Sequence, residues 1–175
     1  MKRREFITLL GGAATAFPLT ALAQQPMPLV GFLNSASSNT YRFNADSFRE
    51  GLARAGFTEG RNVRIEERWA NGDYLTLPTL AAELVAKGVA VIAATGDVAS
   101  AQAAQGASRT VPVVFTIGAD PVRFGLVASL NRPGGHVTGV SLLTSLIGAK
   151  RVDLLRQVAP RVSRIALLMS LSRSS

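Results

Sequence analysis

Apolar runs of strand length alternate with segments of helical period through most of this chain, and this alternation constrains the fold most. The strand-like runs cover residues 29–33, 62–69, 89–94, 111–117, 137–140 and 164–169. Apolar residues spaced three or four apart predict helices within 45–55, 78–88, 98–107, 126–130 and 147–158. Because uniformly apolar strands separated by helices are buried on both faces, the sequence predicts an α/β fold with a doubly wound parallel sheet.

Residues 1–23 have the layout of an export signal. A charged start precedes a short, mildly apolar stretch, and Ala21 and Ala23 form an A-x-A cleavage site. The adjacent Arg3 and Arg4 suggest the twin-arginine route across the bacterial inner membrane. The apolar stretch is shorter than the ~18 residues of a membrane span and is interrupted by glycine, so we expect a periplasmic protein without a stable membrane anchor.

Composition excludes several functional classes. The formal charge of +8 comes from basic residues that are scattered along the chain, which argues against nucleic-acid binding. The chain has no cysteine and one histidine, His136, so thiol chemistry, a metal site and a Ser–His pair are not expected. The first strand lacks the glycine pattern of a dinucleotide site. We therefore expect neither a cofactor nor an enzyme.

Polar residues gather after the strands at the edge where ligands bind in open parallel sheets. With strand order 2-1-3-4-5, the order reverses between the first and third strands, and binding sites form at that point. The loops there are 34–40 and 95–97, with 116–121 next to them, and they are rich in hydroxyl and amide groups. Such groups suit the capture of a carboxylate or phosphate. Each of them also serves as an ordinary helix cap, and sequence alone leaves both roles open.

Several longer motifs resemble a known family. They are 30–37, 48–63, 91–96 and 112–116, and above all the stretch 120–140, with Asp120-Pro121-Val122 followed by Leu130-Asn131-Arg132-Pro133-Gly134-Gly135. Together they resemble ABC-transporter substrate-binding proteins of the type I periplasmic fold, in the group with tryptophan- and phenylalanine-binding receptors.

The resemblance implies a two-lobed receptor that captures a small solute, such as an amino acid, and delivers it to an ABC permease in the inner membrane. Residues 28–141 would form the first lobe, and 142–175 would begin a truncated second lobe. The ligand contacts implied for the first lobe are Ser35, Ala36, Thr95, Gly96, Thr116 and Asp120, with the solute ammonium near Asp120.

Two alternatives remain open at this point. The first is a small exported α/β enzyme that acts through Asp120 and Ser35, although no nucleophile elbow or general base accompanies them. The second is a single-lobe sensor domain whose cleft is completed by a partner chain.

Overall fold

The computed structural model describes residues 27–166. At positions 145 and 146 it describes the backbone and not the side chains. The strands are β1 (Leu29–Asn34), β2 (Arg64–Trp69), β3 (Val91–Thr95), β4 (Val113–Ile117) and β5 (Val137–Ser141). The helices are α2 (Ser38–Arg54), α3 (Leu77–Ala86), α4 (Val98–Ala107) and α5 (Gly148–Val158), with the 3₁₀ turns η2 (Tyr74–Thr76) and η3 (Thr144–Ile147). The predicted leader features Arg3, Arg4, Ala21 and Ala23 lie outside the described residues.

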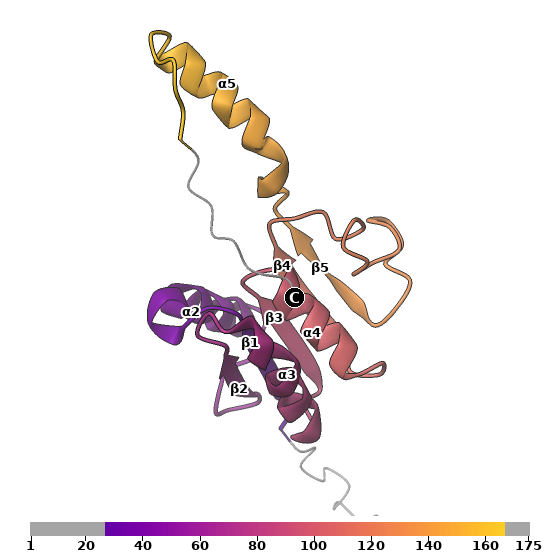
Figure 1. Ribbon diagram of the computed structural model, residues 1–175. Coiled ribbons are helices and arrows are strands. Elements are labelled where there is room, and N and C mark those ends of the chain that lie inside the picture. Colours follow the sequence, from indigo (N-terminus) through magenta and orange to yellow (C-terminus); the bar gives the residue numbers. More distant parts are fainter. Residues whose placement is uncertain (1–26, 167–175) are drawn as a thin grey trace, which may run out of the picture.

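The five strands form one parallel sheet in the order β2-β1-β3-β4-β5, which confirms the predicted topology (Figure 1). Helices α3 and α4 cover one face of the sheet and α2 covers part of the other. The order reverses between β1 and β3, so the connections from these two strands leave in opposite directions. A crevice therefore opens at their carboxyl ends.

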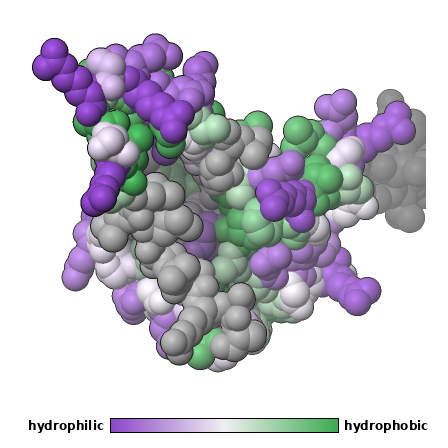
Figure 2. Space-filling model, turned by 45° about the horizontal axis from the view of Figure 1, so that its top comes forward, coloured by the Kyte–Doolittle hydropathy of each residue, from purple (hydrophilic) through white to green (hydrophobic). Residues whose placement is uncertain are grey.

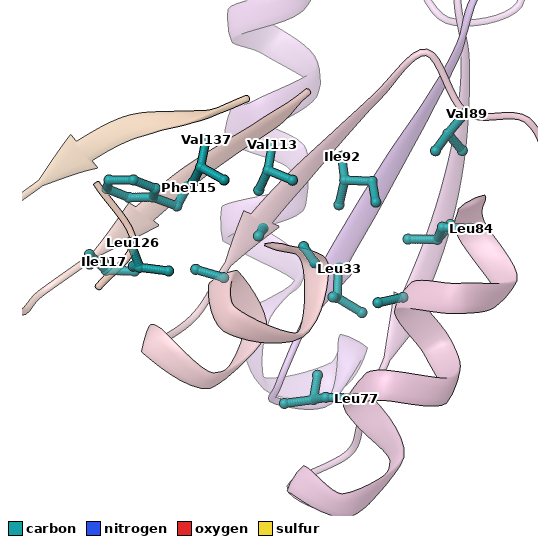
Figure 3. Close-up of a cluster of buried hydrophobic side chains, with 14 of the residues drawn as sticks. Leu33, Leu77, Leu84, Val89, Ile92, Val113, Phe115, Ile117, Leu126 and Val137 are labelled. Atoms are coloured by element: carbon teal, nitrogen blue, oxygen red, sulfur yellow. The ribbon is translucent and has the colours of Figure 1, made fainter. Parts of the chain in front are cut away.

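The main core lies between the sheet and helices α3 and α4. Alternate strand residues such as Leu33, Ile92 and Phe115 belong to the same buried cluster as Leu77 and Leu84 of α3 (Figure 3). The small residues Ala81, Ala101 and Ala104 let the two helices approach the sheet closely. Burying each large side chain contributes roughly 1.5–3 kcal/mol, so this face holds most of the stability of the fold.

The opposite face is smaller and more aromatic. Phe32 packs between Phe48 of α2 and Trp69 of β2, with ring centroids 5.4 and 5.3 Å apart. Ala45 and Ala93 complete this second cluster. The cluster fixes α2 over β1 and β3 and leaves the same face of β4 and β5 open. Val114 and Val140 are exposed there as a result.

The edge strand β2 carries charged side chains on both of its faces. Glu66 forms ion pairs with Arg68 and with Lys87 beside α3. Glu67 points to the other face, where it accepts hydrogen bonds from Arg49 and from the Trp69 indole. A strand edge lined with charged side chains resists pairing with another chain.

Two sequence predictions of local structure are wrong. Residues 126–130 form bends and irregular chain instead of a helix, because Leu126 N–H bonds to Pro121 O and Gly125 adopts φ +69°, which stops a helix at that point. The buried Leu126 instead adds to the main core. The expected strand at 164–169 is absent over its described part, residues 164–166, and its remainder lies outside the described residues.

The segment after β5 leaves the sheet. Helix α5 extends away from the rest of the molecule, and each of its residues is exposed (Figure 1). Its apolar residues include Leu154, Leu155 and Val158, and Val158 is 84% exposed. A helix with an uncovered apolar face lacks a packing partner within the described residues.

Candidate functional site

A row of polar side chains crosses the sheet near its carboxyl edge. Strand register places Asn34 of β1, Thr95 of β3 and Thr116 of β4 side by side, with Trp69 and Val140 at the two ends of the row. Register partners in a sheet point to the same face. The row lies on the sheet face that α2 covers. Phe32 and Ala93 precede Asn34 and Thr95 by two residues and therefore share their face, and both belong to the aromatic cluster beneath α2.

Asn34 links the first and third strands through its side chain. Its Nδ2 donates to Thr95 Oγ1 at 2.9 Å, and its Oδ1 accepts from the Ala36 backbone N–H at 2.8 Å. The side chain is fully buried. A buried amide held at both ends rigidifies its surroundings, so Asn34 fixes both the loop that follows β1 and the Thr95 hydroxyl.

The turn after β2 clamps the same loop from the other side. The backbone N–H groups of Ala70, Asn71 and Gly72 donate to the carbonyls of Asn34, Ala36 and Ser35 at 2.9, 3.2 and 2.8 Å. Asn71 and Gly72 reach these carbonyls from positive φ values of 54° and 84°. The loop 34–36 is thus ordered by three main-chain bonds from a neighbouring turn.

Gly96 lies directly against this loop. A Cβ atom at Gly96 would lie 2.9 Å from Ser35 Oγ and 3.1 Å from Asn34 Oδ1, and the residue adopts φ +104°. Only glycine tolerates both the crowding and this backbone conformation without strain. The sequence predicted that the loops after β1 and β3 would meet, and Ser35, Asn34 and Gly96 are in contact there.

Tyr74 and Asp97 add a phenol and a carboxylate beside Ser35. The negative charge of Asp97 raises the pKa of Tyr74, and partial burial and the hydrogen bond from the phenol to Asp97 act in the same direction. A hydrogen bond with Ser35 acts in the opposite direction. Asp97 also accepts from the Ser100 N–H at 3.0 Å and so caps α4, as predicted.

A hollow of about 550 Å³ opens next to the polar row. Its polar lining includes Thr95, Gly96, Thr116 and Thr144, and its apolar lining includes Tyr41, Phe43, Phe48, Ile117 and Leu142. Figure 2 shows hydrophobic and hydrophilic side chains interspersed on one face of the molecule. Phe43 is 80% exposed, and Tyr41, with φ −115° and ψ 17°, kinks the first turn of α2. The hollow therefore combines hydroxyl groups with aromatic side chains.

The structure separates the six site residues expected from sequence into three groups. Thr95, Gly96 and Thr116 line the hollow. Ser35 and Ala36 form the layer behind Gly96, and the Ala36 N–H is already bonded to Asn34. Asp120 lies in the next loop, where its Oδ1 accepts from the Val122 N–H at 2.9 Å and caps its own turn.

Sequence reasoning missed Asn34 and the aromatic lining of the hollow. Asn34 directly follows a strand of apolar residues, which was the available signal, but its partner Thr95 lies 61 residues away. Tyr41 and Phe43 fall in the first turns of α2, where aromatic residues are usually assigned to packing. His136 immediately precedes β5 at the amino edge of the sheet, so it lies at the opposite end of the sheet from Ser35.

Two further features are absent from the described part of the chain. Residues 27–166 contain no group of three or more potential metal-ligating side chains. Over the same residues, no helix combines the length and the apolar character needed to cross a membrane.

An open parallel sheet with a hollow at its topological switch point defines a ligand-binding α/β lobe. Comparison with known proteins identifies its family. The sequence profile of ABC transporter substrate binding proteins matches residues 33–175, which is most of the chain. The protein therefore belongs to this family, and the resemblance noted in its motifs is confirmed.

Similar proteins include receptors with named amino-acid ligands. A tyrosine-binding protein of Clostridioides difficile is 33% identical over 125 residues, which are 71% of this chain and 35% of that protein. A Streptococcus pneumoniae ABC domain solved in complex with L-Trp superposes with a TM-score of 0.67 at 28% identity, over 77% of this chain and 44% of that one. A conserved domain protein of Vibrio cholerae gives a TM-score of 0.70 at 28% identity, over 78% and 45%. The chain thus spans less than half the length of these relatives.

Proposed function

We propose that this chain provides one wall of the solute site of a periplasmic ABC-transporter receptor, and that the solute is an amino acid with an aromatic side chain. The observation that carries the proposal is the hollow beside the polar row, where the hydroxyl groups of Thr95 and Thr116 lie next to Tyr41 and Phe43. The chain's role is then capture and delivery to a permease in the inner membrane, without catalysis.

The hydroxyl groups suit the carboxylate of an amino acid. Thr95 and Thr116 are register partners at the carboxyl ends of neighbouring strands, so their side chains lie on the same face. Hydrogen bonds from neutral donors to a charged carboxylate are stronger than bonds between neutral groups. Two donors on a rigid sheet can therefore hold a carboxylate in one position.

The aromatic lining suits the side chain of the solute. Phe43 and Tyr41 project from the first turns of α2 and face the hollow together with Leu142. Aromatic pairs contribute about 0.5–1.5 kcal/mol beyond the burial of their area. The L-Trp complex of one relative and the tyrosine-binding name of another agree with this class of solute.

Asp120 remains the proposed partner of the solute ammonium. Its Oδ1 is bonded to the Val122 N–H, and within residues 27–166 its second carboxylate oxygen accepts no hydrogen bond. Ser141 Oγ donates to the Ala119 carbonyl at 2.6 Å and steadies the backbone next to Asp120. A carboxylate positioned by its own turn binds a cation with little loss of side-chain entropy.

One lobe alone should bind weakly. A micromolar site corresponds to about −8 kcal/mol, and half of that free energy corresponds to about −4 kcal/mol, or millimolar affinity. Residues 142–158 lead away from this lobe, as a connection toward a second lobe would. We expect the 175-residue chain to show millimolar affinity and the same ligand preference as its longer relatives.

Titration by two-dimensional NMR tests this function. L-tryptophan should shift amide signals of Thr95, Gly96 and Thr116 at millimolar concentration, and a sugar such as glucose should not. Phe43→Ala should weaken L-tryptophan binding about threefold to tenfold, by loss of an aromatic contact. Phe57→Ala is the matched control, because Phe57 is also exposed but lies beyond the far end of α2. Shifts caused by glucose alone, or equal effects of the two substitutions, would contradict the proposal.

A further inference from the structure

We propose that Asn34 is a positioning residue that selects ligands bearing a carboxylate, because its side-chain amide forces the Thr95 hydroxyl to act as a donor. This inference rests on the proposed function, since it assigns the polarity of the contact that Thr95 makes with a solute. Asn34 is the buried member of the row and does not line the hollow. It therefore acts through Thr95.

The orientation of the Asn34 amide follows from its partners. A backbone N–H can only donate, so the atom 2.8 Å from the Ala36 nitrogen must be the carbonyl oxygen of the side chain. The other end of the amide is then the NH₂ group, which has no lone pair to offer. Thr95 Oγ1, 2.9 Å from this group, must accept. Rotating the amide by 180° would turn the NH₂ group toward the Ala36 N–H and lose that bond, and this fixes the assignment.

The Thr95 proton must consequently point elsewhere. A hydroxyl group has one proton and two lone pairs, and the side facing Asn34 Nδ2 is occupied by an accepted bond. Within residues 27–166, Thr95 Oγ1 has no acceptor for its own proton, and Thr95 lines the hollow. The hydroxyl thus offers a donor to the hollow, and a carboxylate is an acceptor without any proton of its own.

The arrangement is rigid before any ligand arrives. The backbone carbonyl of Asn34 accepts from the Ala70 N–H at 2.9 Å. Asn34 is 0% exposed, so its side-chain amide cannot turn toward water. Gly96 is packed against the same amide, since a Cβ atom added to Gly96 would lie 3.1 Å from Asn34 Oδ1. A donor that is held in place by buried neighbours does not lose conformational freedom when it binds.

The decisive variant is Asn34→Asp. An aspartate carboxylate keeps the bond from the Ala36 N–H but cannot donate to Thr95, so Thr95 would donate to residue 34 and present lone pairs to the hollow. We expect L-tryptophan to bind at least about tenfold more weakly, the usual effect of losing a hydrogen bond to a charged group. L-tryptophanamide, which has no carboxylate, should change about threefold or less, because its amide can also donate.

A double-mutant cycle separates this effect from simple charge repulsion by Asp. Thr95→Val removes the hydroxyl and keeps the shape, and Thr95→Ser retains it. If Asn34 acts through Thr95, Asn34→Asp should change L-tryptophan affinity less than about twofold in the Thr95→Val background. A further tenfold loss in that background would show direct repulsion and overturn the inference.

NMR titration of the full chain gives all these affinities, and the dispersed amide spectrum of each variant reports whether it is folded. The pair Thr95→Val and Thr95→Ser keeps the inference testable if Asn34→Asp does not fold. Valine should lower the preference for L-tryptophan over its amide, and serine should preserve it. An unchanged preference in Thr95→Val would refute the role of the hydroxyl while leaving the proposed function intact. Failure of the unsubstituted protein to bind either probe would instead overturn the proposed function and this inference with it.

Discussion

Replacement of Gly96 by alanine should damage both the stability and the binding site of this protein. Gly96 adopts φ +104°, and an added Cβ would lie 2.9 Å from Ser35 Oγ and 3.1 Å from Asn34 Oδ1. Both neighbours are buried, and Asn34 is held by bonds to Ala36 and Thr95. Neither can move away without breaking a contact.

The magnitude follows from two contributions. A non-glycine residue at such a φ costs about 1–2 kcal/mol of backbone strain. Displacing a buried, hydrogen-bonded side chain by a few tenths of an ångström adds about 1 kcal/mol. We therefore expect Gly96→Ala to lower the free energy of unfolding by about 2–3 kcal/mol. For a chain of this size that corresponds to a fall in Tm of roughly 4–12 °C.

Gly106→Ala is the matched control, because it makes the same chemical change with the opposite expectation. Gly106 lies inside α4, and no atom comes within 4 Å of an added Cβ. Alanine should stabilise the protein there by about 0.5–1 kcal/mol through helix propensity.

Urea denaturation followed by Trp69 fluorescence measures both variants, since Trp69 is the only tryptophan and packs against Phe32. Calorimetric melting provides an independent value. A Gly96→Ala protein that melts within 1 °C of the unsubstituted one would show that the contact between the first and third loops is not tight. Equal destabilisation by Gly106→Ala would show that the effect is not specific to Gly96.

Two further predictions concern the surface. The hydrogen bond from Lys87, followed by that from Arg68, lowers the pKa of Glu66. Glu66 therefore contributes stability that is fully present above its unfolded pKa near 4. This contribution is lost as the pH falls through the lowered pKa of the folded state. Lys87→Ala should lower the free energy of unfolding by about 0.5 kcal/mol at pH 7, a small value because Lys87 is half exposed. The variant should also lose less stability on acidification. Urea titrations at pH 7 and pH 3 measure both effects. Leu155→Glu on the exposed face of α5 should reduce self-association in sedimentation experiments and leave Tm unchanged within 1 °C, whereas a large fall in Tm would mean that α5 is packed.

The layer architecture could be predicted from sequence because its signals are local. Continuous apolar runs identify β1, β3 and β4, and helical spacing with terminal glycine or aspartate identifies α3 and α4. The sequence failed where local signals conflict with backbone geometry. The apolar residues around Leu126 suggested a helix, but Pro121 and the positive φ of Gly125 produce turns that deliver Leu126 to the core.

The relation between the site residues depends on register, which no local pattern reveals. Asn34 and Thr95 each end an unremarkable strand and Thr116 is the last residue but one of β4, so any one of them reads as a helix cap or a loop residue. Pairing of β1 with β3 and of β3 with β4 brings them into one row. A slip of one residue in either pairing would send Thr95 to the opposite face and break its bond with Asn34.

This dependence on register explains why the hydroxyl groups and the amide have different roles although they share one row. Asn34 lies under the loop that follows β1, so it is buried and must satisfy every polar atom within the protein. Thr95 and Thr116 lie farther along the sheet, beside the part of the face that α2 leaves open, and both line the hollow. The part of the sheet face that α2 leaves open is therefore where the hydroxyl groups of the polar row reach the hollow.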